Sequence, residues 1–194
     1  MRKDLISSAV AVVALTVIFG LAYPLVITGI SQVAFPNKAD GSQIKQNGKV
    51  VGSRLLGQDF SADHALFQTR PSPTGDNPAG TAFSNLGPNS RDLRDNIAKN
   101  ARTYLRLNAP YNPGLTRSDI PADAVQTSAS GVDPHISVAN ARIQAGRVAA
   151  RNGLSKARVL ALVKANTDGR SLGILGEPGV NVLDLNLAIQ GARR

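Results

Sequence analysis

The feature that most constrains this chain is a run of 33 residues without a charged side chain, between Asp4 and Lys38. Within it lies a 26-residue, predominantly apolar stretch, residues 5–30. At about 1.5 Å of rise per residue, a helix of that length extends roughly 39 Å, which exceeds the hydrocarbon core of a bilayer at about 30 Å. We therefore expect a transmembrane helix over about residues 5–30, within an anchoring segment 1–34 that begins with a short cytoplasmic tip.

The charges that flank this helix predict its orientation. Arg2 and Lys3 precede the apolar stretch, whereas the first basic residue after it is Lys38. The positive-inside rule then places the N-terminus in the cytoplasm and the rest of the chain outside. A cleaved signal peptide is the alternative, but the stretch is longer than a 7–15 residue signal core, and the motif Ala9-Val10-Ala11 comes too early for cleavage. We expect a retained anchor.

The composition of the helix suggests that other helices approach it. Glycine and threonine allow close contact between helix backbones, and a proline is best tolerated where neighbouring helices satisfy the freed backbone groups. A lone helix remains the alternative, because single anchors also contain these residue types. The residues expected at a packing surface are Gly20, Tyr23, Pro24, Thr28 and Gly29.

The remainder of the chain predicts one domain of the α+β class, mostly helical in its second half. Residues 35–48 are rich in turn-forming residues and are expected to form a linker to a domain over 49–194. Aromatic residues are only 4% of the chain, so the core must be mainly aliphatic. The expected elements are a strand over 49–58, helices over 91–107, 138–152 and 156–167, and a short helix or strand over 181–189.

Three local patterns refine this outline. Ser137 and Ser155 are placed to cap the helices that follow them, and Gly153 is placed to end the first of these. Residues 71–90 are rich in proline and glycine and predict a long loop, which in a compact domain usually serves function or docking. Residues 108–121 have the composition of a second connection.

The net charge of +9 is distributed unevenly and narrows the class of partner. Residues 142–194 carry nine basic and three acidic side chains. A basic surface suits nucleic acid, anionic lipid or an acidic protein. The same stretch contains no Phe, Tyr or Trp, on which single-stranded nucleic acids stack. We expect membrane lipid or a protein partner, and no nucleic acid.

Residues that could perform catalysis are few, since the chain has no cysteine, two histidines and one glutamate. His64 follows Asp63, and His135 lies two residues after Asp133, but neither pair has the context of a hydrolase triad or metal site. Local hydrogen bonding is the expected role for both, and no metal site is predicted. The glycine-rich stretch 75–81 lacks the lysine of a phosphate-binding loop. A binding or scaffolding role is favoured over a free-standing enzyme.

Six blocks of sequence carry a more specific signal. They are Gly20–Gly29, Val51–Gln58, Arg70–Ser72, Ser84–Pro88, Thr127–Ser137 and Leu175–Asn186. Together, and in this order, they resemble the C subunit of the bacterial Kdp potassium-importing ATPase. The residues in these blocks that we expect to dock partners or shape the domain are Arg70, Pro71, Ser72, Asn85, Gly87, Pro88, Ser130, Gly131, Asp133, Glu177 and Asn181.

The resemblance implies a subunit of a multi-protein pump in the bacterial inner or plasma membrane. Its partners would be a channel-like A subunit with the potassium path, a P-type B subunit that hydrolyses ATP, and a small hydrophobic F peptide. This chain would be no enzyme by itself. It would stabilise the assembly as an accessory subunit. From the predicted topology we further expect its extracytoplasmic domain to cap the potassium entrance, docking partly through the loop 71–90.

The family also suggests an alternative role, in which the chain raises the ATP affinity of the B subunit as a catalytic chaperone. The nucleotide ligand would then be a glutamine that corresponds to Gln144, and ATP would be the bound cofactor. Here Ala145-Gly146 follows where the family has an apolar residue and a proline, and Gly179 stands where it often has a basic residue. The alternative also conflicts with the predicted topology, because ATP is cytoplasmic and the domain is expected outside.

Overall fold

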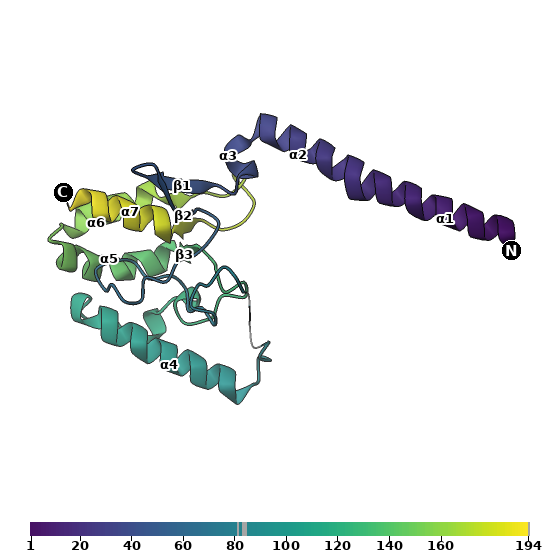
Figure 1. The fold of residues 1–194 in the computed structure, drawn as a ribbon. Helices are drawn as coiled ribbons and strands as arrows, with labels where there is room; N and C mark the ends of the chain where they lie inside the picture. The colour runs from purple at the N-terminus through teal and green to yellow at the C-terminus, as the bar shows by residue number, and fades with distance from the viewer. Residues whose placement is uncertain (81, 83–84, 194) are drawn as a thin grey trace. The chain divides into compact units, whose positions relative to one another are not determined.

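The computed structural model describes residues 1–80, 82 and 85–193. Its contacts divide the chain into two units, Met1–Ser53 and Arg54–Arg194. The predicted α+β class is confirmed: a long apolar helix occupies the N-terminal part, and helices dominate the second half of the chain (Figure 1). The boundary between the units falls after Ser53, and the expected division into a linker over 35–48 and a domain over 49–194 stays a prediction.

The first unit consists mainly of one helix that is continuous from Arg2 to Ala34 and has none of its apolar window buried. It comprises α1 (Arg2–Val17), the π-helical turn η1 (Ile18–Ala22) and α2 (Tyr23–Ala34). Among the described residues it is the one helix whose length and composition suit a membrane span. The helix extends a few residues beyond the predicted 5–30 at both ends.

The π turn lies where Pro24 disturbs the helix. Proline has no N–H, and its ring collides with the carbonyl four residues earlier, which here belongs to Gly20. The helix widens over Ile18–Ala22, so that the N–H of Tyr23 bonds to the carbonyl of Ile18 five residues back. Such π turns are a recognised way to absorb a local conflict without ending the helix.

The segment 35–48, expected to be a linker, contains regular structure. A short helix, α3 (Pro36–Ala39), is followed by strand β1 (Gln43–Gln46), which pairs antiparallel with β2 (Lys49–Ser53). The two-residue turn between the strands is Asn47-Gly48, with φ of +51° and +78°. Asn-Gly is the residue pair that such a turn favours, so the sequence carried a hairpin signal in this segment. The strand expected over 49–58 ends at Ser53.

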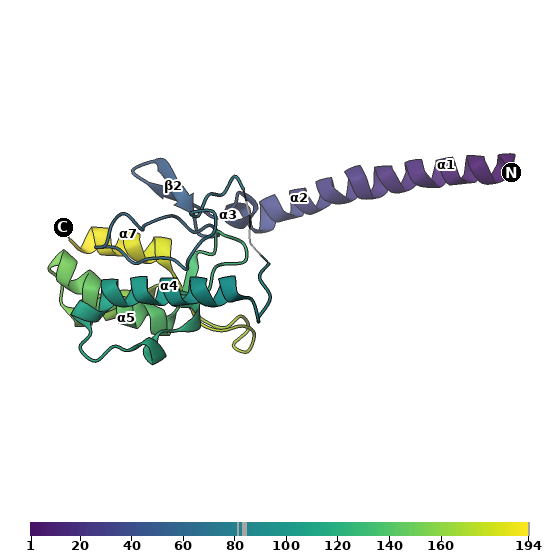
Figure 2. The ribbon, with the colours of Figure 1, turned by 90° about the horizontal axis from the view of Figure 1, so that it is seen from below.

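The second unit packs helices, which Figure 2 shows from below, on a small antiparallel sheet. The sheet has the order β3-β5-β4, with β3 (His135–Ser137), β5 (Gly179–Asn181) and β4 (Thr167–Asp168). The helices are α4 (Arg91–Asn108), α5 (Val138–Asn152), α6 (Lys156–Ala165) and α7 (Val182–Ala192). Three short 3₁₀ turns lie between α4 and β3: η2 (Ala109–Tyr111), η3 (Arg117–Asp119) and η4 (Ala122–Ala124).

Local capping explains where these helices begin and end. Ser137 accepts a hydrogen bond from the N–H of Asn140 and Ser155 from that of Arg158, which confirms both predicted caps. Gly153 adopts φ +65° after the last residue of α5. Helix α6 stops at Ala165 rather than near residue 167, because the chain passes directly into β4. The expected helix or strand over 181–189 proves to be the end of β5 followed by most of α7.

Among the residues that the structure describes, the core is aliphatic, as predicted, apart from the buried Phe67. It gathers one face each of α5, α6 and α7 with the sheet and the extended segment 66–67. Its members buried to below 2% exposure include Phe67, Val148, Val159, Val180, Leu185 and Ile189.

Candidate functional site

Two of the recognised sequence blocks meet in the second unit. Arg70 Nη1 donates to Asp133 Oδ2 at 2.9 Å, and the pair is partly exposed. Ser72 Oγ donates to the carbonyl of Gly131 at 2.6 Å and accepts from the N–H groups of Thr74 and Asp76. These bonds fold the segment 70–76 onto the segment 131–133.

Gly131 is required at this junction for two reasons. Its φ of +75° lies in the left-handed region, which side chains with a Cβ rarely adopt. A Cβ at this position would also come within 2.8 Å of Thr74 Oγ1. The neighbouring Ser130 accepts a hydrogen bond from the N–H of Val132. Ser130, Gly131 and Asp133 therefore hold the turn 130–133 against the segment 70–76.

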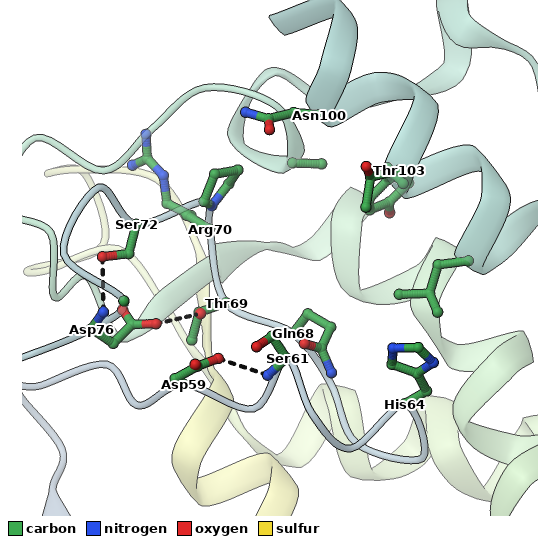
Figure 3. Close-up of a pocket in the computed structure, with 15 residues that line it drawn as sticks. Asp59, Ser61, His64, Gln68, Thr69, Arg70, Ser72, Asp76, Asn100 and Thr103 are labelled. Atoms are coloured by element: carbon green, nitrogen blue, oxygen red, sulfur yellow. Dashed lines mark hydrogen bonds between the residues drawn. The ribbon is translucent and has the colours of Figure 1, made fainter. Parts of the chain in front are cut away.

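A cleft of about 350 Å³ lies between α4 and the segment 59–76. Figure 3 shows polar side chains from both walls directed into this region, among them Gln68, Asp76 and Thr103. The lining residues are Asp59, Ser61, His64, Gln68, Thr69, Arg70, Pro71, Ser72, Gly75, Asp76, Asn100, Thr103, Tyr104, Leu107 and Ala124.

Asp76 is the acidic residue of the cleft whose pKa is raised by its surroundings. Its side chain is largely buried, and burial raises its pKa, while a 3.0 Å hydrogen bond from Thr69 partly offsets the effect. The charges of Asp59 and Asp133 raise the pKa further. On the opposite wall, burial raises the pKa of Tyr104, whose hydroxyl bonds to Asn140 Oδ1 at 2.9 Å. No residue in the described part of the chain accepts a hydrogen bond from the buried Nε of Arg70.

Gln144 lies behind the cleft rather than in it. Its Oε1 accepts from the N–H of Gln68 at 2.7 Å and from Arg147 at 2.8 Å. Its Nε2 donates to the carbonyl of Gln68 at 3.1 Å and to Asn140 Oδ1 at 2.9 Å. The side chain is 1% exposed, and these four bonds use its full hydrogen-bonding capacity. A nucleotide could reach Gln144 only if some of these bonds were exchanged, and the expected nucleotide role stays a prediction.

Arg147 is a fully buried cation that the sequence reasoning did not single out. Its guanidinium donates to the carbonyls of His64 and Leu66 and to the side chains of Asn108 and Gln144. Burial lowers its pKa to about 10, so it stays charged at neutral pH. The sequence pattern that could have indicated its burial is helical spacing. Arg147 lies three residues after Gln144, so both side chains are on the same face of α5, which is buried.

The remaining expected docking residues lie in other places. Glu177 is exposed and pairs with Arg170 at 2.8 Å, whereas Asn181 is buried, caps α7 and donates to the carbonyl of Arg54. Asn85 adopts φ +49° in the loop before α4, and Pro88 follows Gly87, whose carbonyl accepts from the N–H of Ser90. The helix residues Gly20, Tyr23, Pro24, Thr28 and Gly29 are all exposed.

Both aspartate–histidine pairs make local hydrogen bonds, as predicted. Asp63 accepts from the N–H of Ala65 at 2.8 Å, and Asp133 accepts from that of His135 at 3.0 Å. The ring of His135 also lies 3.2 Å from Asp168. Within residues 1–80, 82 and 85–193, no group of three or more acidic, histidine or cysteine side chains could hold a metal ion.

The chain thus joins a long exposed apolar helix, of a length and composition that suit a membrane span, to a folded domain, which is the pattern of a membrane-associated protein. The family model for the K⁺-transporting ATPase c chain, KdpC, matches residues 5–191. The chain therefore belongs to the KdpC family, as the six sequence blocks predicted, and is a subunit of a potassium-transporting ATPase.

Curated relatives agree with this assignment, and each is named a potassium-transporting ATPase KdpC subunit. The relative from Koribacter versatilis is 42% identical over all of this chain and 97% of its own length. That from Rhodospirillum rubrum is 48% identical over 97% of this chain and 96% of its own length. That from Methylibium petroleiphilum is 46% identical over the full length of both chains.

Proposed function

We propose that the chain is a non-catalytic accessory subunit that holds the potassium-transporting ATPase together. Its helix packs against the membrane-spanning subunits, and its domain docks over the potassium entrance. The observation that carries this proposal is the long apolar helix Arg2–Ala34, which has no buried side chain within its own chain. Such a surface is available to partner helices and lipid.

Small residues provide the contact points on this helix. A Cβ added at Gly29 would meet no atom within 4 Å, and one at Gly20 would meet only a methyl of Thr16 at 3.8 Å. Because lipid tails are as apolar as leucine, close backbone packing at such positions is what favours helix association in a membrane. Pro24 has no N–H to offer to the carbonyl of Gly20, and a neighbouring helix can satisfy a carbonyl freed in this way. The partners in this proposal are the A, B and F subunits.

The orientation is proposed from charge. Arg2 and Lys3 precede the helix and no base follows before Lys38, which favours a cytoplasmic N-terminus and an extracytoplasmic domain. The chain has no cysteine, so Asn77→Cys would introduce a unique thiol in the loop before α4. A membrane-impermeant thiol reagent added to intact cells should label it. Labelling only after the cells are broken would contradict the proposed topology.

The decisive experiment for assembly removes the anchor. A chain without residues 1–33 should no longer co-purify with the other subunits, and the remaining complex should lose integrity in detergent. Gly29→Leu should weaken co-purification in the full chain, whereas Ile30→Leu, one position away on the exposed helix, should leave it unchanged. A tight complex that persists without residues 1–33 would contradict the proposal.

The alternative role, as a chaperone for ATP binding, depends on Gln144. It predicts that the detergent-solubilised chain binds ATP and that Gln144→Ala weakens the binding. Absence of ATP binding by the wild-type chain would end this alternative. The saturated hydrogen bonding of Gln144 and the proposed topology both favour the structural role.

A further inference from the structure

The exposed large hydrophobic side chains of the described second unit fall in two short segments. We name them the apolar surface: Leu55, Leu56, Leu172, Ile174 and Leu175. Leu172 is 90% exposed and Ile174 is 75% exposed, values close to those of an unfolded chain. Most of the apolar surface belongs to the loop 169–178 between β4 and β5, which projects from the domain as a narrow yellow-green hairpin (Figure 2).

The conformation of this loop keeps its apolar side chains away from the core. Ser171 and Leu175 exchange two backbone hydrogen bonds of 2.9 Å, which close the turn. Within the turn, Leu172 adopts φ +55° and Gly173 φ +78°. A left-handed conformation is uncommon for leucine and is retained only where the surrounding structure imposes it. The turn therefore holds the apolar side chain of Leu172 in contact with water.

The base of the loop lies where the chain enters the second unit. Arg54, the first residue of that unit, lies 3.5 Å from Asp168, the residue before the loop. The carbonyl of Arg54 also accepts from Asn181, two residues after β5 begins. Leu55 and Leu56 follow Arg54 directly. Both segments of the apolar surface are thus attached at one point of the domain.

The path from the membrane helix to this point is short. In the first unit, Gln32 in the last turns of the helix donates to Asp40 at 3.0 Å. Ser53, at the end of β2, donates to the carbonyl of Gly41 at 2.7 Å. The hairpin therefore returns the chain to the end of the helix, and Arg54 follows by one peptide bond. The base of the loop is therefore tethered to the end of the membrane helix by the short segment 35–53.

We propose that the apolar surface inserts into the boundary between headgroups and acyl chains of the bilayer that holds the helix. Aliphatic side chains gain free energy when they leave water for that region. Because the helix already anchors the chain, insertion is intramolecular and requires little affinity. The inference rests on the membrane helix but not on the direction in which the helix crosses the bilayer.

Lipid fits this surface better than a protein partner. Residues 171–176 carry no charge, and Arg170 and Glu177 at the base neutralise each other through hydrogen bonds of 2.8 and 2.9 Å. The surface thus lacks the charged groups that give protein interfaces their specificity. Five aliphatic side chains also cover far less than the roughly 800 Å² that each partner buries in a stable interface.

The test uses the full chain in phosphatidylcholine vesicles with a fluorophore on a unique thiol. Ile174→Cys places the fluorophore on the apolar surface, Ala161→Cys on the exposed side of α6 is the matched control, and Val13→Cys reports on the membrane helix. Nitroxide-labelled lipid should quench the fluorophore at 174 several-fold more than at 161, and aqueous iodide should show the reverse order. Lipid quenching at 13, with iodide quenching equal at 174 and 161, would overturn the inference and leave the proposed function intact.

The assembled ATPase distinguishes lipid from protein. The fluorophore at 174 should remain accessible to lipid nitroxide when the other subunits are present. Shielding from both quenchers in the complex, with no lipid quenching in the chain alone, would identify a protein surface as the occupant and overturn the inference. Circular dichroism of each labelled variant should match the wild type, since the substituted positions are exposed.

Discussion

The side-chain amide of Gln144 pairs with both backbone polar groups of Gln68, through hydrogen bonds of 2.7 and 3.1 Å. The amide of Asn186 does the same for Phe67, at 2.8 and 2.9 Å. Each amide takes the place that a neighbouring strand would occupy in a sheet. Two successive residues of an extended segment are thus held by side chains from α5 and α7.

Gln144→Ala should therefore destabilise the protein by about 2–4 kcal/mol, because the buried backbone groups of Gln68 lose their partners. Gln190→Ala, at an exposed position of α7, should change stability by less than about 0.5 kcal/mol. Urea unfolding of the full chain in detergent micelles would measure both. A neutral Gln144→Ala variant would refute the structural role and make a ligand role more attractive.

Arg147→Met should cost about 3–5 kcal/mol, since methionine fills the space but leaves four oxygen acceptors, three of them in buried bonds, without the guanidinium. Arg151→Met is the matched control, because Arg151 lies four residues later on α5 and makes one exposed bond to Tyr111. The same unfolding experiment should find the control close to wild type. Equal losses in the free energy of unfolding at Arg147 and Arg151 would contradict the hydrogen-bond network assigned to Arg147.

Gly131→Ala should destabilise the chain by about 1–3 kcal/mol through its left-handed backbone and the contact with Thr74. Gly80→Ala meets no atom within 4 Å and should be close to neutral. Thr74→Ala should relieve the steric part of the Gly131→Ala effect but not the backbone part. A double-mutant cycle measured by thermal unfolding would separate them, and strict additivity would rule out the contact.

Asp76 predicts a specific dependence of stability on pH. Because its pKa is raised in the folded state, the folded chain binds the proton more tightly than the unfolded chain. The free energy of unfolding should therefore fall as pH rises from the ordinary value of 3.8 through the folded pKa. Asp76→Asn keeps an acceptor for Thr69 and cannot ionise, so its stability relative to wild type should rise across that range.

Asp119 provides a control of opposite sign. Hydrogen bonds from the side chain and backbone of Thr116 lower its pKa, so its contribution is present above pH 3.8 and is lost as pH falls through the folded pKa. Asp119→Asn should thus reduce stability at neutral pH and not below the folded pKa. Denaturant unfolding at several pH values would compare both variants. Curves with the same slope for the two would contradict the assigned environments.

Much of the architecture could be predicted because its signals are local. Length and absence of charge indicated the helix that contains residues 5–30, and Ser137, Ser155 and Gly153 marked the ends of helices. The hairpin at Asn47-Gly48 also had a local signal, which was hidden by the turn-rich composition around it. These features depend on a few neighbouring residues, so one sequence is enough to identify them.

The candidate site depends on contacts between distant residues. The sequence blocks suggested Arg70 and Asp133 separately, but the 2.9 Å bond between them spans 63 positions and follows from the packed fold. Arg147 is one of nine basic residues in the stretch 142–194, and only its neighbours in space make it a buried cation. The periodicity of a helical sequence shows which face of the helix a residue occupies. It does not show which residues of other elements pack against that face.

The amide pairs with Phe67 and Gln68 have a consequence for the order of folding. Their bonds join residues that are 119 and 76 positions apart, so this segment can be fixed only after α5 and α7 have formed. The wall of the cleft that contains Gln68 should then be among the last parts to become ordered. Amide hydrogen exchange should be slow in the two helices and faster at Phe67 and Gln68, because the N–H groups of these two residues bond to side chains and not to a helix or a sheet.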